Sequence, residues 1–429
     1  MITSAAWRGK RYAVLGLARS GIATVDALLA SGASVVAWDS KEEARAKAPG
    51  AELADPLEID LAGFDGVVVS PGVPLNKHPI VARAAAAGVP VIGDIELFAR
   101  ARAELPAHKA IGITGTNGKS TTTALIHHII EAAGIPAQLG GNIGLPILGQ
   151  DPLPEGGVYV LELSSYQIDL TSSLDCDVAV LLNITPDHLD RYDGFAGYAA
   201  SKERLFRMQS PGHAAVIGIG DGPSAEIAKR LARAGRAEDV TKIAPGVCMD
   251  QSRWPSLQGP HNAQNALAAI AACEAIGVAN EAIDEGLRTY PGLPHRMERV
   301  ATRNGVLFVN DSKATNPTST APALASFPRI RWILGGLAKT DDLDACRPSF
   351  GHVAKAYTIG EAGPMFETLL APEMAVEQSG DLATAVRHAA AEAQPGETVL
   401  LSPACASFDQ FSDYEARGRA FRAAVEALG

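Results

Sequence analysis

The 429-residue sequence predicts an α/β protein with three domains. Short apolar segments typical of buried strands alternate with Ala- and Leu-rich segments typical of helices, and this alternation indicates parallel sheets covered by helices. The chain is also too long for one ordinary domain. A cluster of Pro and Gly at residues 290–295 is typical of a hinge between two domains.

The first segment, which we assign to residues 1–98, begins with a βαβ series. Residues 11–16 and 34–38 are expected as buried strands, and residues 20–31 between them are typical of a helix. A third strand is expected at residues 66–70. Consecutive units of this kind predict a parallel sheet with helices on its faces.

A glycine-containing turn follows the first of these strands. The sequence Gly16-Leu-Ala-Arg-Ser-Gly21 resembles the dinucleotide-binding fingerprint G-x-G-x-x-G, and Asp39 follows Gly21 at about the distance the fingerprint requires. Ala18 stands where the fingerprint has its middle glycine. The turn therefore predicts a site for a nucleotide diphosphate, with a nicotinamide dinucleotide as an equal alternative.

The second segment, residues 99–296, contains a further α/β unit. A strand expected at residues 110–114 precedes a helix expected at residues 120–133, and more strands are expected at 158–163 and 178–183. The strand–helix order again predicts a parallel sheet.

The sequence Gly115-Thr-Asn-Gly-Lys-Ser120 connects this strand to this helix. Its glycines allow backbone N–H groups to surround phosphate oxygens at the positive end of the helix. Lys119 is expected to bind the β- and γ-phosphates, and Ser120 to bind Mg²⁺. The spacing departs from the standard G-x-x-x-x-G-K-[ST] loop, because Ile113 occupies the first glycine position. A tight turn with a surface lysine is the alternative, which the strand–loop–helix context disfavours.

Polar residues also end the neighbouring strands. Glu162 closes one strand at the edge where open α/β sheets bind ligands, so it is either an Mg²⁺ ligand or the partner of a nearby cation. His188 follows the next strand beside two aspartates and an arginine, which favours a metal or substrate role over a structural one. Asn262 and Asn265 share one face at the start of a helix, where asparagine is ordinarily a cap.

The third segment, residues 297–429, has three expected strands that each end in a polar motif. The strands are expected at residues 306–310, 331–335 and 398–402, and the polar motifs at residues 310–316, 335–342 and 402–411. Lys, Ser and Asp at three strand ends predict a pocket for a charged small molecule, with solvated loops as the alternative.

The composition argues against several classes of protein. There are 48 Asp and Glu residues against 37 Lys and Arg residues, and the net charge of −11 disfavours nucleic acid and anionic membranes as partners. The five cysteines are scattered without a C-x-x-C pair, so neither a disulfide framework nor a zinc site is expected. We find no signal peptide and no apolar run of about 20 residues, and expect a cytoplasmic monomer without membrane insertion.

The ordered series of motifs resembles the Mur ligase family of peptidoglycan precursor synthesis, and within it the members that add D-glutamate. The resemblance covers nearly the whole chain, through residues 93–98, 115–120, 141–146, 162–167, 183–191, 261–262, 293–296, 310–316 and 402–411. It implies a Rossmann-like N-terminal domain, a central P-loop ATPase-type α/β domain and a Rossmann-like C-terminal domain. It also implies a ligase that uses ATP and Mg²⁺ to join D-glutamate to UDP-N-acetylmuramoyl-L-alanine through an acyl phosphate.

The resemblance further assigns roles to single residues. The catalytic positions are Lys119, His188 and Lys202. The metal ligands are Ser120, Glu162, His188 and Lys202, the last as a carbamylated lysine. The ATP-binding positions are Gly115, Thr116, Asn117, Gly118, Lys119, Ser120, Thr121, Asn262, Asn265, Arg296 and Asp311. The positions for the UDP-linked substrate are Arg19, Ser20, Asp39, Ser40, Ser70, Gly72 and Asn142. Those for D-glutamate are Lys313, Thr315, Lys339, Ser407 and Phe408.

The sequence leaves three alternatives open. The first is a related ligase for another amino acid, such as L-glutamate, or an enzyme similar to folylpolyglutamate synthase. The second is a nicotinamide-dependent oxidoreductase built on the first domain. The third is a P-loop module in which ATP only drives a change of conformation, and the polar strand ends of the third segment disfavour it.

Overall fold

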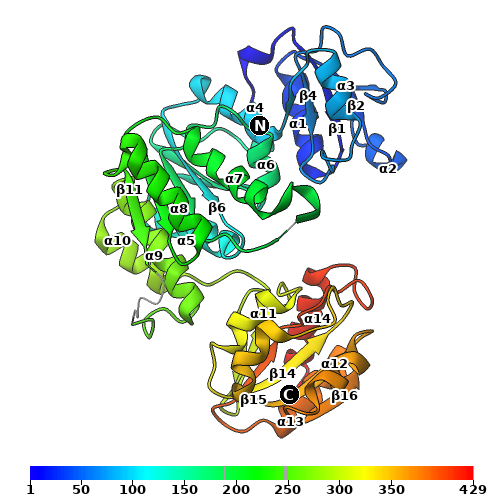
Figure 1. Ribbon diagram of the computed structural model, residues 1–429, viewed down its shortest axis with the longest axis vertical. Helices are drawn as coiled ribbons and strands as arrows, with labels where there is room; N and C mark the ends of the chain where they lie inside the picture. The colour runs from blue at the N-terminus through cyan, green and yellow to red at the C-terminus, as the bar shows by residue number, and fades with distance from the viewer. Residues whose placement is uncertain (188, 245–249, 429) are drawn as a thin grey trace. The chain divides into compact units, whose positions relative to one another are not determined.

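The computed structural model describes residues 1–187, 189–244 and 250–428. The chain divides into two compact units, residues 1–245 with 264–287 and residues 246–263 with 288–429. The first unit contains two parallel sheets and the second contains one mixed sheet, so the predicted α/β class is confirmed (Figure 1). The expected domain boundaries, after residues 98 and 296, stay predictions.

The first sheet has five parallel strands in the order β3-β2-β1-β4-β5. Its strands are β1 (Arg11–Leu15), β2 (Ser34–Trp38), β3 (Glu52–Leu53), β4 (Gly66–Val69) and β5 (Val91–Ile92), with helices η1 (Ala5–Trp7), α1 (Arg19–Ala30), α2 (Glu42–Arg45) and α3 (Ile80–Ala86). Along β1, Tyr12 and Val14 belong to the same buried cluster as α1, whereas Ala13 and Leu15 belong to the cluster that contains α3. Because both faces of β1 are buried, its sequence is a continuous apolar run.

The second sheet has six parallel strands in the order β11-β10-β9-β6-β8-β7. Its strands are β6 (His108–Thr114), β7 (Ala137–Gly141), β8 (Gly157–Glu162), β9 (Val178–Leu181), β10 (Ala214–Gly218) and β11 (Val240–Ile243). The helices are α4 (Asp94–Ala101), η2 (Arg102–Glu104), α5 (Lys119–Ala132), η3 (Ile147–Gly149), α6 (Ser165–Asp169), η4 (Leu189–Arg191), α7 (Gly194–Arg207), α8 (Gly222–Leu231), η5 (Ala232–Arg236), α9 (Pro260–Ala275) and α10 (Asn280–Thr289). α5 packs on β6, β7 and β8, while α7 and α8 pack on β9 and β10.

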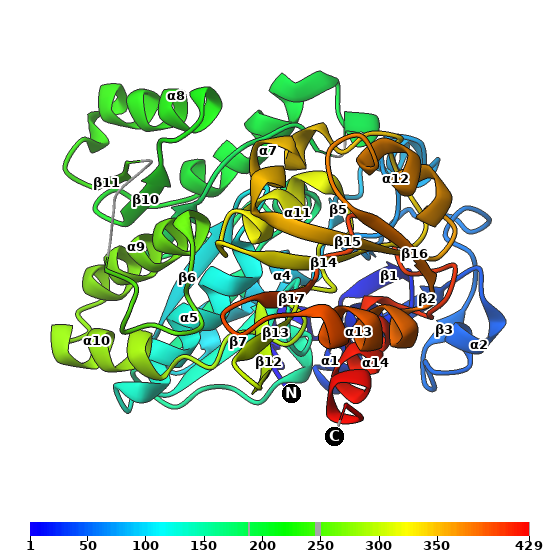
Figure 2. The same cartoon turned by 90° about the horizontal axis from the view of Figure 1, so that it is seen from below.

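The third sheet has six strands in the order β12-β13-β17-β14-β15-β16, of which only β12 runs antiparallel to its neighbour. Its strands are β12 (Glu298–Arg303), β13 (Val306–Asn310), β14 (Ile330–Gly335), β15 (Val353–Ile359), β16 (Val376–Gly380) and β17 (Thr398–Leu401). The helices are α11 (Pro317–Leu324), η6 (Asp344–His352), α12 (Gly363–Leu370), α13 (Leu382–Glu392) and α14 (Tyr414–Glu426). α11 and α12 bury one face of the sheet, and α13 and α14 bury the other (Figure 2).

The described part of the chain bears on the expected lack of a membrane span and of a disulfide framework. None of its helices has the length and apolar character needed to cross a membrane. Its four cysteines are buried free thiols, whereas Cys248 lies outside the described residues.

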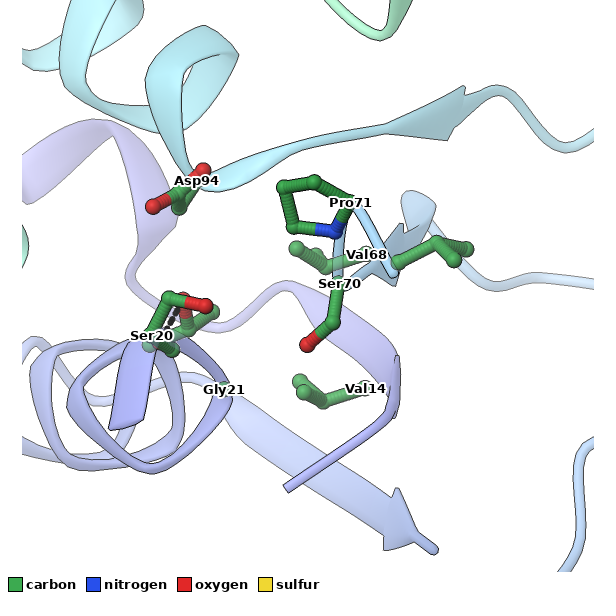
Figure 3. A pocket seen from close by; sticks show the side chains of 9 residues that line it. Val14, Ser20, Gly21, Val68, Ser70, Pro71 and Asp94 are labelled. Carbon is green, nitrogen blue, oxygen red and sulfur yellow. Dashed lines mark hydrogen bonds between the residues drawn. The ribbon is translucent and has the colours of Figure 1, made fainter. Parts of the chain in front are cut away.

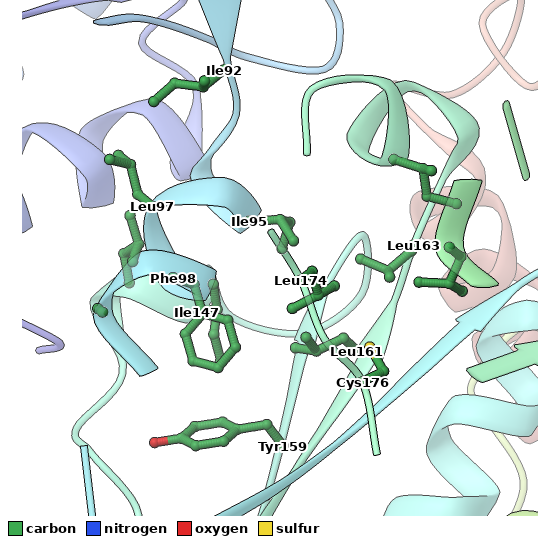
Figure 4. Close-up of a cluster of buried hydrophobic side chains, with 14 of the residues drawn as sticks. Ile92, Ile95, Leu97, Phe98, Ile147, Tyr159, Leu161, Leu163, Leu174 and Cys176 are labelled. Atoms are coloured by element: carbon green, nitrogen blue, oxygen red, sulfur yellow. The ribbon is translucent and has the colours of Figure 1, made fainter. Parts of the chain in front are cut away.

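Helix α4 connects the first sheet to the second. Its Ile95, Leu97 and Phe98 are buried in the cluster that also holds Tyr159 and Leu161 of β8 (Figure 4). The rings of Phe98 and Tyr159 meet edge to face with their centroids 5.0 Å apart. This apolar contact fixes the connecting helix against the second sheet.

Glu96 on the same helix adds a buried polar contact. Its carboxylate accepts hydrogen bonds from the backbone N–H groups of Ser172 and Ser173, at 2.8 and 3.0 Å, and from Arg100 Nε at 2.9 Å. Burial acts to raise the pKa of Glu96, but these hydrogen bonds outweigh it and hold the pKa below the usual value. The carboxylate therefore stabilises the fold above its unfolded-state pKa, and this contribution is lost as the pH falls through the folded-state value.

We expect Glu96→Ala to destabilise the protein by about 3 kcal/mol at neutral pH, because it leaves two backbone donors and a guanidinium without their acceptor. Chemical denaturation of the variant and the wild type measures this loss. The difference between their free energies of unfolding should become smaller in acid. Glu43→Ala, at an exposed position of α2, is the control and should change the stability by less than about 0.5 kcal/mol. Equal stabilities of the two variants would contradict the role of Glu96.

Candidate active site

The first sheet reverses its strand order between β1 and β4, and the loops after these strands form a crevice at such a switch point. Ser70, after β4, donates a hydrogen bond from Oγ to the carbonyl of Gly16, after β1, at 2.8 Å. A Cβ on Gly21 would lie 1.9 Å from the same carbonyl, so only glycine allows α1 to begin this close to the turn. The pocket beside them is lined by Ser20, Ser70 and Asp94 among others (Figure 3).

The Asp39 carboxylate stabilises the turn after β1 by hydrogen bonds to the backbone. Its carboxylate accepts hydrogen bonds from the backbone N–H groups of Leu17 and Lys41, at 2.8 and 2.9 Å. Burial opposes the ionised form, yet these bonds keep the pKa of Asp39 below its usual value. Of the residues predicted for the UDP-linked substrate, Ser20 and Ser70 thus share one pocket, whereas Asp39 binds the backbone of the turn after β1. Arg19, Ser40 and Gly72 are exposed and do not line that pocket.

The predicted phosphate loop lies between β6 and α5 and needs its glycines. Gly115 and Gly118 have φ values of +151° and +85°, which side chains rarely adopt. A Cβ on Gly118 would lie 2.4 Å from Oδ1 of Asn265, so the predicted nucleotide residue Asn265 packs directly on the loop. Lys119 is the first residue of α5, and Ser120 is buried behind it.

Asn183, to which the sequence assigned no role, braces this loop. Its Oδ1 accepts a hydrogen bond from the backbone N–H of Asn117 at 2.9 Å, and its Nδ2 donates to the Asn117 carbonyl at 3.1 Å. Its own carbonyl accepts from the backbone N–H of Thr116 at 2.9 Å. The Thr116 hydroxyl bonds to Thr185 and lies 3.2 Å from the Tyr198 hydroxyl. The loop is therefore fixed in shape by the segment that follows β9.

Two lysines meet at the same loop. Lys119 Nζ donates to the carbonyls of Gly115 and Thr116, at 2.9 and 2.8 Å. Lys202 of α7 is almost fully buried, and its Nζ donates to the Gly115 carbonyl at 2.9 Å and lies 4.6 Å above the Tyr198 ring. Burial, together with the charge of Lys119, lowers the pKa of Lys202 well below that of a free lysine. An amine that loses its proton this readily is a nucleophile.

Glu162 ends β8 beside the strand that leads into the loop, paired in register with Ile113. Its Oε1 accepts a hydrogen bond from Asn142 Nδ2 at 2.8 Å, while its Oε2 is buried and has no hydrogen-bond partner among the described residues. An unsatisfied buried carboxylate oxygen fits a cation ligand, because leaving it unpaired is otherwise unfavourable. Within the described ranges, no group of three or more His, Cys, Asp and Glu side chains could hold a metal ion. His188, predicted as a metal ligand and catalytic residue, lies outside those ranges.

The second unit contains the other predicted nucleotide residues. Asp311 follows β13, and its carboxylate accepts hydrogen bonds from Ser402 Oγ at 2.8 Å and the backbone N–H of Met297 at 3.2 Å. Burial raises the pKa of Asp311 to about 7. Arg296 lies close enough to act electrostatically on this carboxyl group. Asn262 donates from Nδ2 to the Gln258 carbonyl at 3.1 Å.

The residues predicted for D-glutamate follow three adjacent strands of the third sheet, because β17 lies between β13 and β14. Lys313 Nζ lies 3.9 Å from the centre of the Tyr414 ring, and Lys339 Nζ donates to Thr315 Oγ1 at 3.4 Å. Ser407 is buried, whereas Phe408 is 69% exposed. The structure thus places the three polar motifs at one edge of this sheet.

We expect Asn183→Ala to raise the dissociation constant for a non-hydrolysable ATP analogue about tenfold, since the loop loses two hydrogen bonds worth about 1.4 kcal/mol together. Isothermal titration calorimetry measures the change. Asn280→Ala, at an exposed position of α10, should bind as the wild type does. If Asn183→Ala bound the ATP analogue as tightly as the control does, the Asn183 hydrogen bonds to the loop would have no part in binding.

Comparison with known families matches all three segments of the chain. Residues 10–93 match the MurD-like N-terminal domain of Mur ligases, residues 113–245 the Mur ligase middle domain, and residues 295–405 the glutamate ligase domain of Mur ligases. The three matches together cover more than half of the chain.

Among curated proteins, the chain is 65% identical to a UDP-N-acetylmuramoylalanine--D-glutamate ligase of Novosphingobium aromaticivorans, over 100% of this chain and 97% of that protein. It is 57% identical to the protein of the same name in Zymomonas mobilis, with both chains fully covered. The solved structure of the MurF ligase from Thermotoga maritima in complex with ADP has the same fold, with a TM-score of 0.61 at 14% identity over 99% of this chain and 97% of that one. By these matches, the chain belongs to the Mur ligase family.

Proposed function

We infer that the protein is an ATP-dependent ligase that joins D-glutamate to UDP-N-acetylmuramoyl-L-alanine, in the cytoplasmic synthesis of peptidoglycan precursors. The proposal rests above all on the braced loop at residues 115–120, with buried Lys202 at its carbonyl and Glu162 at the end of β8. The full-length similarity to relatives named for this reaction supports the choice of both substrates.

The loop suits the first chemical step. A carboxylate is a poor electrophile, so one of its oxygens must first become part of a good leaving group. Transfer of the γ-phosphoryl group of ATP to the L-alanine carboxylate gives an acyl phosphate. Lys119, Thr116 and the N-terminus of α5 offer positive charge and hydrogen-bond donors for the transferred group.

Mg²⁺ fits the residues beside the loop. The unpaired oxygen of Glu162 is a suitable ligand, and Ser120, His188 and a carbamylated Lys202 would complete the set. Bound there, the ion would offset the negative charge of the phosphates. Carbamylation would convert Lys202 from a cation into an anion, and its burial favours the neutral amine that reacts with CO₂.

The second unit suits the second step, in which the amine of D-glutamate attacks the acyl phosphate and phosphate leaves. D-Glutamate carries two carboxylates, and Lys313 and Lys339 supply two cations at the ends of β13 and β14. Thr315 and Ser407 add hydroxyl groups at the same edge of the sheet. We propose that these residues bind D-glutamate, and that Asn262, Asn265, Arg296 and Asp311 surround the nucleotide.

The proposal predicts that ADP release requires ATP, UDP-N-acetylmuramoyl-L-alanine and D-glutamate together. A coupled ADP assay that compares D-glutamate, L-glutamate and other amino acids tests this directly. Lys119→Ala should keep its fold by circular dichroism and lose turnover, because the phosphoryl charge loses its cation. Release that does not depend on D-glutamate would refute the substrate assignment, and tight NAD binding without ATP turnover would favour an oxidoreductase.

A second prediction concerns Lys202. With ¹³C-bicarbonate, the wild type should show a carbamate carbon resonance that is absent from Lys202→Ala, and this variant should lose at least about 100-fold in kcat. Lys229→Ala, whose side chain is 60% exposed on α8, should keep both the resonance and the activity. A wild-type spectrum without a carbamate resonance, or a fully active Lys202→Ala, would contradict the modification.

A further inference from the structure

Arg417 of α14 is a buried cation with an unusual set of partners. Its side chain is among the largest that are fully buried, with a relative exposure of 1%. In the part of the chain that the structure describes, no carboxylate forms an ion pair with it. Burial lowers the pKa of Arg417 to about 10, so the side chain remains charged at neutral pH. A buried charge of this kind is unfavourable unless hydrogen bonds replace the lost water.

Four backbone carbonyls and one hydroxyl group accept those hydrogen bonds. Arg417 Nε donates to Ser312 Oγ at 3.0 Å, and Nη2 donates to the carbonyls of Ser312 and Cys405 at 2.9 and 3.0 Å. Nη1 donates to the carbonyls of Ala406 and Gly335 at 3.2 and 3.4 Å. The five N–H groups of the guanidinium therefore have five oxygen acceptors.

These acceptors lie in the loops that follow β13 and β17 and at Gly335, the last residue of β14, where the loop after this strand begins. Each loop also carries residues assigned above to D-glutamate, listed here in chain order: Lys313 and Thr315, then Lys339, then Ser407 and Phe408. One residue separates Ser407 from Cys405 in the third loop, and Lys313 directly follows Ser312 in the first. A shift of any acceptor would therefore move a neighbouring pocket residue.

The loops themselves are under steric constraint around the guanidinium. Gly336 has a φ of +126°, and a Cβ there would lie 2.3 Å from the Ala406 carbonyl and 3.1 Å from Arg417 Nη1. Ala404 has a φ of +57°, a conformation that costs free energy in a residue with a side chain. Leu337 and Ala406 exchange two backbone hydrogen bonds, which join the second loop to the third. The Arg417 hydrogen bonds offset the free-energy cost of these backbone conformations.

We propose that Arg417 is the positioning residue of the amino-acid pocket, which it organises by holding all three strand-end loops through their carbonyl oxygens. This inference rests on the proposed function, because it takes the pocket to be that for D-glutamate. The guanidinium that binds these carbonyls belongs to a side chain that is 1% exposed. Lysine cannot replace it, since an ammonium group has three N–H donors and no planar fork.

The test is the variant Arg417→Lys, which keeps the charge and removes part of the hydrogen-bond set. We expect its KM for D-glutamate to rise at least about tenfold, the loss of about 1.4 kcal/mol, while the KM values for ATP and UDP-N-acetylmuramoyl-L-alanine change less than twofold. A residue with only a structural role would lower the amount of active enzyme and leave all three KM values unchanged.

Arg331→Lys is the matched control in the same sheet. Arg331 is also largely buried, but it pairs with Glu397 and Glu392 near the start of β14, at the opposite end from the loops. The Arg331→Lys variant should have a lower thermal stability than the wild type and an unchanged KM for D-glutamate. An equal KM for D-glutamate in the two variants would overturn the proposal.

Hydrogen–deuterium exchange provides a reading that needs no substrate and does not depend on the proposed reaction. In Arg417→Lys, we expect faster exchange confined to residues 311–316, 336–339 and 404–408 at a temperature where both variants are folded. Uniformly faster exchange over residues 288–428, or no change, would overturn the positioning role. A wild type that uses another amino acid would refute the proposed substrate, while localised exchange would still support the role of Arg417.

Discussion

Loops at the carboxyl ends of parallel strands have backbone polar groups that no neighbouring strand can satisfy, and the rest of this structure depends on how they are held. In each sheet a polar side chain from elsewhere in the chain binds that backbone. Asp39 holds the turn after β1, Asn183 holds the loop after β6, and Arg417 holds the loops after β13, β14 and β17. Each site is thus fixed by one residue that need not touch a substrate.

The charges at the second sheet support the proposal of a ligand with several negative charges. Two lysines share the Gly115 carbonyl, and one of them is buried where its cationic form is unfavourable. Glu162 has a buried oxygen without a hydrogen-bond partner in the part of the chain that the structure describes. A phosphate and its counter-ion, bound as proposed, would stabilise these groups, because opposite charges interact strongly where water is excluded.

Much of the fold follows from the sequence because buried parallel strands are apolar on both faces. The strands expected near residues 11–16, 34–38, 110–114, 306–310 and 398–402 all exist, with ends that differ by at most two residues. The sequence predicted none of the edge strands, which are β3, β5, β7, β11, β12 and β16, and it also did not predict the interior strands β10 and β15. Edge strands have one neighbour and partly exposed faces, so sequences such as Val376-Glu-Gln-Ser-Gly380 carry no continuous apolar signal.

By itself, the sequence determined the α/β class and the family and predicted the phosphate loop, because these depend on local patterns and on the order of motifs. Only the tertiary structure decided which side chains support those motifs. Asn183 and Arg417 lie 66 and 82 positions from backbone groups that they bind, and no local pattern marks such a pair. The physical reason is that a buried donor or acceptor takes the partner that the packing of the strands brings near, whatever its distance along the chain.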